Sequence, residues 1–420
     1  MSRAMAKSRK LVSKPGLFFR DMLLNKFPIE AEIDINRSNT AQENARKLTK
    51  KLRRDVSTPV KKTTNGIPRP QPIGVIQASF PVDIVYTWVD LADSNFFEVL
   101  SRFKETNQAT NSESSDKSRF ENRDELLYSL RSIEAYAPWV NHIYIVTNGQ
   151  VPVWLDASNK NVTIVSHEEI IPEQYLPTFN SHVIESCIHR IPGLSEHYIY
   201  FNDDVLLARP LSKTDFFTET GLAYLFSTNS RLPNGPKSES DTPTQWAAKN
   251  ARSLIFGEWG CYLDTMFAHT FHPQRKSVAQ DNESLFEKEL HYCRLNRFRG
   301  EEDLLFTSFL NHHVGFLTGR GLLTRTHGFY FNIRQRGAIN SYRKLLQLKG
   351  GPAAPASMCL NDRMTDDEWP EYEKHLVDFL NAYFPKRSSY EKPEQEKTFE
   401  NFQVDSVESK ESEFFVKAAE

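Results

Sequence analysis

Cysteine is scarce in this sequence, and its spacing excludes two classes of small, cross-linked protein. The four cysteines, Cys187, Cys261, Cys293 and Cys359, lie 74, 32 and 66 residues apart and form no Cys-x-x-Cys pair. Disulfide frameworks and zinc modules need denser and more closely spaced cysteines. The sequence therefore predicts neither a disulfide scaffold nor a zinc module.

Long apolar runs are missing as well. No stretch approaches the ~18 consecutive apolar residues of a membrane-spanning helix, and residues 1–30 contain no apolar block followed by a small-residue cleavage site. We therefore expect a cytoplasmic protein that does not cross a membrane.

With 39% hydrophobic and 25% charged residues among 420, the composition excludes fibrous, collagen-like and wholly disordered chains. The chain is long enough for two or three domains or for one elaborated domain.

Charge is distributed unevenly along the chain. Residues 1–80 contain 17 Lys and Arg against 6 Asp and Glu, whereas the rest contains 35 against 48. Within residues 10–27, Leu, Phe and Met alternate with Lys and Arg as in a short amphipathic helix with a basic rim. We expect this basic helical N-terminal arm, residues 1–80, to bind an anionic membrane surface or, alternatively, to pack on the body. No nucleic-acid partner is expected, because the arm has no recognised motif and the body is acidic.

From residue 81 the pattern indicates strands that alternate with helices. The predicted strands are 83–90, 142–149, 161–169 and 197–204, with a further strand or loop at 222–227, and the predicted helices are 124–136, 180–191, 246–256, 282–295, 301–312 and 369–384. This order predicts an α/β fold with a mainly parallel, Rossmann-like sheet and flanking helices. We expect one catalytic domain over 81–385, with an inserted loop at 229–248, followed by a charged, mobile tail over 386–420.

Polar side chains stand where several predicted strands end. Asp203 and Asp204 follow one strand, and Asp90 and Asn148 follow two others. Ligands of open α/β sheets bind at the carboxyl ends of the strands, and paired carboxylates there can hold Mg²⁺ or Mn²⁺ against a diphosphate. Because Asn-Asp-Asp is also a good turn sequence, a purely structural role stays open.

A second group of reactive side chains lies in the segment HTFHPQRK, residues 269–276. His269 or His272 could take a hydroxyl proton, and Arg275 with Lys276 could neutralise phosphate. A solvated basic loop is the alternative interpretation.

In the strand at 83–90, Trp88 and Asp90 could dock a nucleotide base and ribose, or belong to the core and a turn.

Together these segments resemble the Stealth family of sugar-1-phosphate transferases. The family includes bacterial capsular polysaccharide phosphotransferases and the catalytic subunit of the lysosomal-enzyme N-acetylglucosamine-1-phosphotransferase. The similarity is carried by DIVYTWVD (83–90), by the long block from 123–155 through 176–210, by FAHTFHPQRKS (267–277) and by CLND (359–362). It covers roughly residues 80–385, and the motifs occur in the order of the family blocks.

The resemblance implies a nucleotide-sugar-transferase-like fold and a defined reaction. A sugar-1-phosphate, expected to be N-acetylglucosamine-1-phosphate from UDP-N-acetylglucosamine, is transferred to a hydroxyl of a growing capsular or cell-surface polysaccharide, which forms a phosphodiester and releases UMP. The alternatives are a conventional metal-dependent glycosyltransferase that releases UDP, and a non-catalytic polysaccharide-binding protein. The expected location is the inner face of the plasma membrane, where the protein would be peripheral.

The resemblance also implies roles for individual residues. We expect Asp203, Asp204 and Asp362 to hold the metal and His269 to be the general base, although an aspartate could serve equally. The expected substrate-binding and phosphate-binding residues are Trp88, Asp90, Arg131, Asn148, Asn180, Ser181, Arg275, Lys276 and Arg299.

Overall fold

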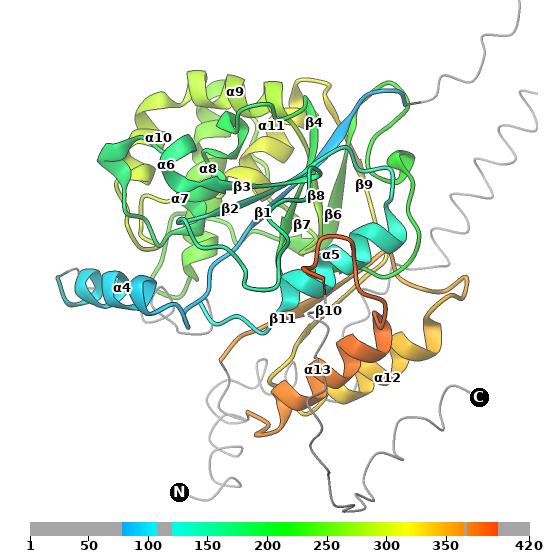
Figure 1. Ribbon diagram of the computed structural model, residues 1–420. Coiled ribbons are helices and arrows are strands. Elements are labelled where there is room, and N and C mark those ends of the chain that lie inside the picture. The colour runs from blue at the N-terminus through cyan, green and yellow to red at the C-terminus, as the bar shows by residue number, and fades with distance from the viewer. Residues whose placement is uncertain (1–77, 107–119, 365–367, 394–420) are drawn as a thin grey trace, which may run out of the picture.

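The computed structural model describes residues 78–106, 120–364 and 368–393, so the N-terminal arm lies almost entirely outside the described residues (Figure 1). At its centre is a five-stranded sheet in the order β3-β2-β1-β4-β8. These strands are β1 (Val82–Thr87), β2 (Ile143–Thr147), β3 (Val162–Ser166), β4 (His197–Asn202) and β8 (His272–Arg275). The first four are mutually parallel and β8 is antiparallel to β4. The predicted α/β fold with a mainly parallel sheet is confirmed.

Both faces of the central sheet are covered, which explains why β1, β2 and β4 are nearly continuous apolar runs. Ile84 and Tyr86 on β1 face a core cluster that includes Leu126 and Leu130 of α5 (Glu125–Tyr136). Val85, between them in sequence, faces the opposite cluster, which is formed with residues near the short helices α6 (His167–Ile170) and α7 (Ser181–Glu185). The alternation follows from the two-residue repeat of a strand.

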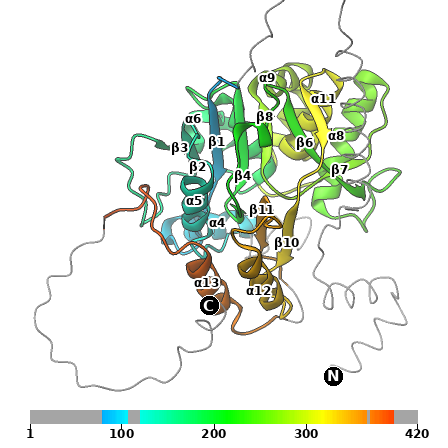
Figure 2. The ribbon, with the colours of Figure 1, turned by 90° about the vertical axis from the view of Figure 1, so that its right-hand side faces the viewer.

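Two smaller sheets flank the central one. One is ordered β10-β11-β5 and packs against the adjacent helices α12 and α13; the other is ordered β7-β6-β9 and lies beside α8 to α11 (Figures 1 and 2). Their strands are β5 (Val205–Leu207), β6 (Ala223–Arg231), β7 (Thr265–Phe267), β9 (Gly321–Thr324), β10 (Gly328–Asn332) and β11 (Ser357–Asn361). The helices of the described chain not yet given are α4 (Ser94–Thr106), α8 (Pro243–Trp259), α9 (Lys276–Leu285), α10 (Glu287–Arg294), α11 (Asn311–Leu317), α12 (Ala338–Leu348) and α13 (Tyr372–Tyr383). Shorter helical turns span Glu173–Tyr175, Ile188–Arg190, Lys213–Asp215 and Phe306–Leu310.

Several helix boundaries differ from the predicted ones. The expected helix at 180–191 is only α7, which ends at Glu185 and is followed by a separate 3-10 turn. The expected loop at 229–248 is shorter than predicted, because β6 extends to Arg231 and α8 begins at Pro243. The early start of α8 has a local cause. The Thr242 side chain accepts the Gln245 N–H, the Gln245 side chain accepts the Thr242 N–H, and proline occupies the first turn.

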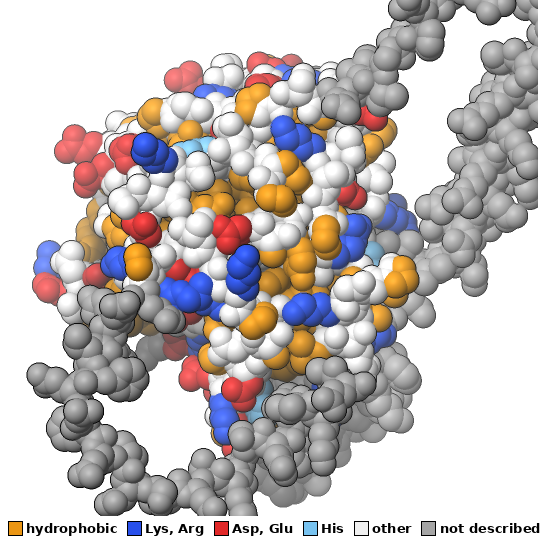
Figure 3. Space-filling model, turned by 45° about the vertical axis from the view of Figure 1, so that its right-hand side comes forward, with side chains coloured by type: hydrophobic (Ala, Val, Ile, Leu, Met, Phe, Trp, Pro, Cys, Tyr) orange, Lys and Arg blue, Asp and Glu red, His pale blue; other side chains and the backbone are white. Residues whose placement is uncertain are grey.

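Two surface properties complete the description of the fold. On the face in Figure 3, Lys and Arg side chains are spread among hydrophobic and acidic ones and do not form one continuous basic surface. Within the part of the chain that the structure describes, no helix combines the length and apolar character needed to cross a membrane.

The C-terminal segment packs on the body beyond residue 385, where a mobile tail was expected. Arg131 donates from Nε and Nη2 to the two carboxylate oxygens of Glu391, at 2.8 Å each. Lys392 and Asp156 add backbone hydrogen bonds that join this segment to the loop after β2. Arg131, expected to bind substrate, therefore binds the segment around Glu391 instead. Residues 394–420 lie outside the described residues.

We predict that Arg131→Met lowers stability by about 3 kcal/mol, because the buried Glu391 carboxylate loses its bidentate guanidinium and keeps, among the described residues, only Arg387 at 3.6 Å and the Ser388 hydrogen bonds. The matched control is Arg231→Met, which removes a pair to Asp264 at 3.5 Å whose arginine side chain is 57% exposed, and should cost less than about 1 kcal/mol. Thermal and urea unfolding give both values. An Arg131 variant with wild-type stability and a raised KM would restore the substrate-binding interpretation.

Candidate active site

The predicted strand ends meet at one edge of the central sheet. Thr87 at the end of β1 is in register with Asn202 at the end of β4 and with Val146 near the end of β2. Trp88 and Asp203 therefore begin the loops that leave the same carboxyl edge. This is the edge at which ligands of parallel sheets bind.

Asp203 and Asp204 form the turn between β4 and β5. The Cys359 thiol, on β11, donates to Asp204 Oδ2 at 3.3 Å, while Asp204 Oδ1 is buried and has no hydrogen-bond partner among the described residues. Burial, followed by the charges of Asp204 and Glu125, raises the pKa of Asp203 well above its usual range. Carboxylates crowded in this way need a proton or a cation to lower their mutual repulsion.

His269 is the exposed histidine that reaches these carboxylates. It lies in the loop between β7 and β8, and its ring nitrogen, an Asp204 oxygen and the Cys359 sulfur all lie within 4.8 Å of one another. His272, three residues later, is buried in β8 with Nδ1 3.1 Å from His312 Nε2. Burial, and then the neighbouring His269, lowers the pKa of His272 to about 3. Of the two candidate bases in this segment, only His269 faces the site.

The start of α5 supplies a carboxyl group that the sequence analysis missed. Glu125 is 5% exposed and accepts the backbone N–H of Arg123 at 2.7 Å. Burial raises the pKa of Glu125 to about 7 against the opposing effect of this hydrogen bond, and Asp204 contributes to the rise. The preceding residue, Asp124, has a φ of 61°, an uncommon backbone conformation for a residue other than glycine. In sequence, Glu125 is indistinguishable from an ordinary acidic residue in the first turn of a helix.

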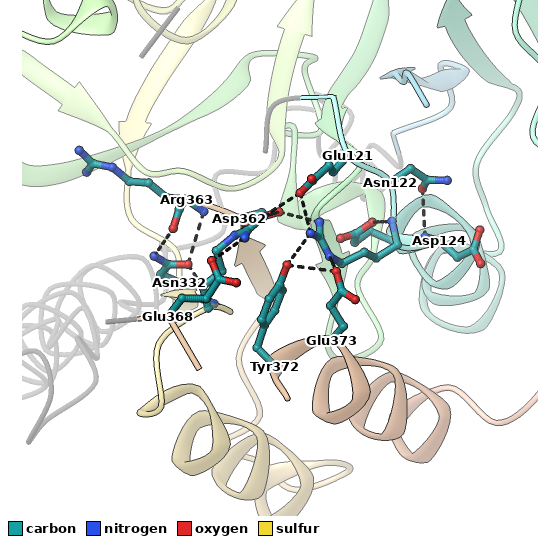
Figure 4. A network of polar contacts seen from close by, with 12 residues as sticks. Glu121, Asn122, Asp124, Asn332, Asp362, Arg363, Glu368, Tyr372 and Glu373 are labelled. Carbon is teal, nitrogen blue, oxygen red and sulfur yellow. Dashed lines mark hydrogen bonds and ion pairs between the residues drawn. The ribbon is translucent and has the colours of Figure 1, made fainter. Parts of the chain in front are cut away.

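Asp362 lies in a neighbouring ionic network and is not placed to ligate a metal (Figure 4). Arg123 Nη1 donates to its Oδ2 at 2.6 Å, and Arg334 donates from Nε to Oδ1 and from Nη2 to Oδ2. Both carboxylate oxygens are therefore engaged by guanidinium groups, whose side chains are only 8% and 5% exposed. The expectation that Asp362 joins Asp203 and Asp204 around a cation is corrected: its role is to hold two arginines.

The same network joins three parts of the chain. Glu121 accepts from both Arg123 Nη2 (2.8 Å) and Arg334 Nη2 (2.7 Å), and Arg123 also donates to Tyr372 on α13 and to Glu373. The loop before α5 is thereby fixed to β11 and α13. Because the Arg123 N–H binds Glu125, this network also positions the carboxyl group of Glu125.

The loops that follow β1 and β2 are joined to each other by hydrogen bonds. Gln150, which was not predicted, accepts the Asp90 N–H (3.0 Å) and donates to the Asp90 carbonyl (2.7 Å). The Asp90 carboxylate accepts from Ala92 N and Asn122 Nδ2, so it shapes the loop before α5. The indole Nε1 of Trp88 is buried without a partner in the described chain. Asn148 is exposed in the turn after β2.

Ser181 and Arg299, which were both expected to bind substrate, are in contact with each other. Arg299 Nη2 donates to Ser181 Oγ at 2.8 Å, and both Arg299 and Asp203 act electrostatically on the buried Tyr200 hydroxyl. Asn180 has a structural role instead, because it is fully buried, caps α7 and donates to Asp303.

Arg275 and Lys276 lie at the opposite edge of the sheet and do not meet Asp203. Arg275 pairs with His197, the first residue of β4, and its side chain donates to Glu196 and to the Gly221 carbonyl. A six-residue strand at ~3.3 Å per residue separates the two edges by about 20 Å. The physical reason is the antiparallel direction of β8, which carries residue 275 away from the edge that residue 269 approaches.

Comparison with known proteins identifies relatives of this chain. Three family models match: Stealth protein CR2, conserved region 2, over residues 119–225; CR3, conserved region 3, over 268–316; and CR4, conserved region 4, over 355–401. Capsular polysaccharide phosphotransferase fcs1 of Haemophilus influenzae is 38% identical over 388 residues, which is 90% of this chain and 100% of that protein. Capsular polysaccharide phosphotransferase LcbA of Neisseria meningitidis is 37% identical, again over 90% of this chain and 100% of the relative.

Two further similarities cover less of this chain. Exopolysaccharide phosphotransferase SCO2592 of Streptomyces coelicolor is 38% identical over 76% of this chain and 34% of its own length. Among solved structures, the galactosyltransferase LgtC in complex with donor and acceptor sugar analogues is similar at 11% identity and a TM-score of 0.35, over 71% of this chain and 95% of that one. With full-length relatives this similar, the chain belongs to the Stealth family of capsular polysaccharide phosphotransferases, and it is an enzyme.

Proposed function

We propose that the enzyme transfers N-acetylglucosamine-1-phosphate from UDP-N-acetylglucosamine to a hydroxyl group at the growing end of a capsular polysaccharide. The acceptor oxygen attacks the β-phosphorus, the bond from that phosphorus to the oxygen bridging the two phosphates breaks, and UMP leaves with the electron pair. The observation that supports the proposal is the approach of His269 to Asp204, next to Asp203, at the carboxyl edge of the parallel sheet. In-line phosphoryl transfer needs charge neutralisation, positioning and help with one proton.

The carboxylates at this edge fit a divalent cation, Mg²⁺ or Mn²⁺. Asp204 Oδ1 is buried without a hydrogen-bond partner in the described chain, and the charges of Asp204 and Glu125 add to the rise that burial causes in the pKa of Asp203. Oxygen ligands of this kind suit both ions. When bound by Asp203 and Asp204, the cation would supply positive charge to the diphosphate.

We assign the remaining roles to three side chains. His269, exposed beside Asp204, would take the acceptor hydroxyl proton, with a nearby carboxylate as the alternative base. Arg299, with Ser181 on its guanidinium, is the cation we place on the leaving phosphate. The unpartnered indole N–H of Trp88 would bind the nucleotide. The proposed location is the cytoplasmic face of the plasma membrane, reached through the basic arm.

The reaction class is tested by its products. We predict that purified enzyme, UDP-N-acetylglucosamine and a short saccharide acceptor yield UMP and a phosphodiester signal in ³¹P NMR, because the bond broken lies between the two phosphorus atoms. A conventional glycosyltransferase attacks the anomeric carbon and yields UDP without a phosphodiester. Other UDP-sugars run in parallel identify the donor, and release of UDP alone would exclude the proposal.

Asp204→Asn should abolish tight Mn²⁺ binding and lower kcat by at least ~10²-fold, the loss typical of one electrostatic stabiliser. The matched control is Asp281→Asn, a surface aspartate whose side chain is 55% exposed and paired with Arg320. Electron paramagnetic resonance of Mn²⁺ measures binding independently of turnover, and EDTA should stop the wild-type reaction. Unchanged Mn²⁺ affinity in the Asp204 variant, at a wild-type melting temperature, would place the cation elsewhere.

His269→Ala and His272→Ala should separate catalysis from packing. The His269 variant is expected to keep its melting temperature and lose roughly 10²–10⁴-fold in kcat, as when a general base is removed. The His272 variant should mainly lose stability, because its ring is buried against His312. Comparable small losses of kcat from both, at unchanged stability, would assign the proton transfer to a carboxylate.

A further inference from the structure

A cleft of ≈ 440 Å³ lies at the edge of the sheet opposite to Asp203. One wall is the turn that contains His189 and Arg190, which leads into the start of β4, and the other is the exposed side of α9 from Lys276 onward. Its volume is in the ~300–1,000 Å³ range of small-molecule sites. The proposed transfer reaction uses none of its residues.

The cleft carries an excess of positive charge. Its one carboxylate, Glu283, accepts from His189 Nε2 (2.6 Å), Arg190 Nη2 (2.5 Å) and Arg294 Nη1 (2.7 Å). Burial alone would raise the pKa of Glu283, but these hydrogen bonds hold it well below its usual range. Glu283 is thus a fully engaged anion between two arginines, and Lys276 adds a further positive charge.

Donors remain for a ligand after these internal bonds are counted. Arg190 uses Nε and Nη2 on Glu283, and Nη1 has no acceptor among the described residues. Lys276 gives one ammonium hydrogen to the Leu194 carbonyl at 3.2 Å. His189, 3% exposed, donates from Nε2 to Glu283, so its neutral ring fixes that carboxylate and adds no donor for a ligand. A guanidinium and an ammonium lining one cleft are the chemistry that binds a phosphate diester.

We propose that this cleft is an acceptor subsite that binds a phosphodiester group of the growing polymer, several units behind the reacting end. The inference rests on the proposed function, because that reaction builds a chain with one negative charge in every unit. The distance of about 20 Å between the two edges of the sheet is a few sugar-phosphate units. A short acceptor would reach only the catalytic edge, whereas a longer one would bind both.

The experiment adds carboxylates to the cleft without touching the catalytic edge. Gln280 and Ser284 are exposed, line the cleft on α9 and have no role in the proposed chemistry, so Gln280→Glu/Ser284→Glu is the test variant. The matched control, Asn340→Glu/Gln347→Glu, makes the same charge change at exposed positions of α12. The probes are synthetic glycosyl phosphodiester oligomers of two and eight units, the eight-unit oligomer with its phosphates methylated to neutral triesters, and inorganic phosphate.

We expect the wild-type enzyme to bind the charged eight-unit oligomer more tightly than the two-unit or neutral one, with an affinity that falls as salt rises. The cleft variant should bind it at least about tenfold more weakly, because like charges are brought together, and the α12 control should not change. In turnover, the cleft variant should raise KM for the eight-unit acceptor and leave the two-unit acceptor unaffected.

Several results would overturn the proposal. One is equal binding of the charged oligomer by the wild type and the cleft variant, and another is an equal loss in the α12 control. If inorganic phosphate competes as strongly as the oligomer, the cleft is a site for a free anion and not for the polymer. Direct binding decides the question even if no phosphodiester product forms, so failure of the subsite and failure of the proposed reaction are distinguishable.

Discussion

The crowding of carboxyl groups at the turn between β4 and β5 is the constraint around which this edge of the protein is built. Asp203, Asp204 and Glu125 come from two elements, and burial raises the pKa of Asp203 well above its usual range and that of Glu125 to about 7. Such a group is stable only if protons or a cation reduce its charge. The diphosphate of the proposed donor would add more negative charge, so the proposed cation would serve both the protein and the substrate.

The arginines nearest this cluster are committed to protein groups. Arg123 and Arg334 enclose Asp362 and share Glu121, and both guanidinium groups are almost fully buried. Removing either would leave buried charge unpaired, which is far more costly than losing a surface pair. The network therefore acts as a frame that fixes the N-terminus of α5 against β11. In the reaction we propose, positive charge for the substrate would come from Arg299 and from the proposed cation.

The sequence predicted what depends on local periodicity and strand direction. Asp203 and Asp90 were placed at one edge because parallel strands end together, and β1 and β4 do end at the same edge. Contacts between residues far apart along the chain were not accessible. Arg131 is 260 positions from Glu391, and nothing in the pattern around either residue indicates the pair. Glu125 was missed because an acidic residue at the start of a helix is common whatever its burial.

The segment 269–276 shows why residue spacing alone does not define a site. Read as a loop, it places His269 and Lys276 together. Within it, residues 272–275 form the antiparallel strand β8, which pairs with residues 197–200 of β4, so His269 and Lys276 lie toward opposite edges of the sheet. Because of the direction of this strand, the two ends of the motif have different neighbours. His269 meets the carboxylates that can activate a donor, and Lys276 lines a cationic cleft on the far side. In the reaction and the acceptor subsite that we propose, the two ends of this segment would act on the reacting terminus and on the chain already made.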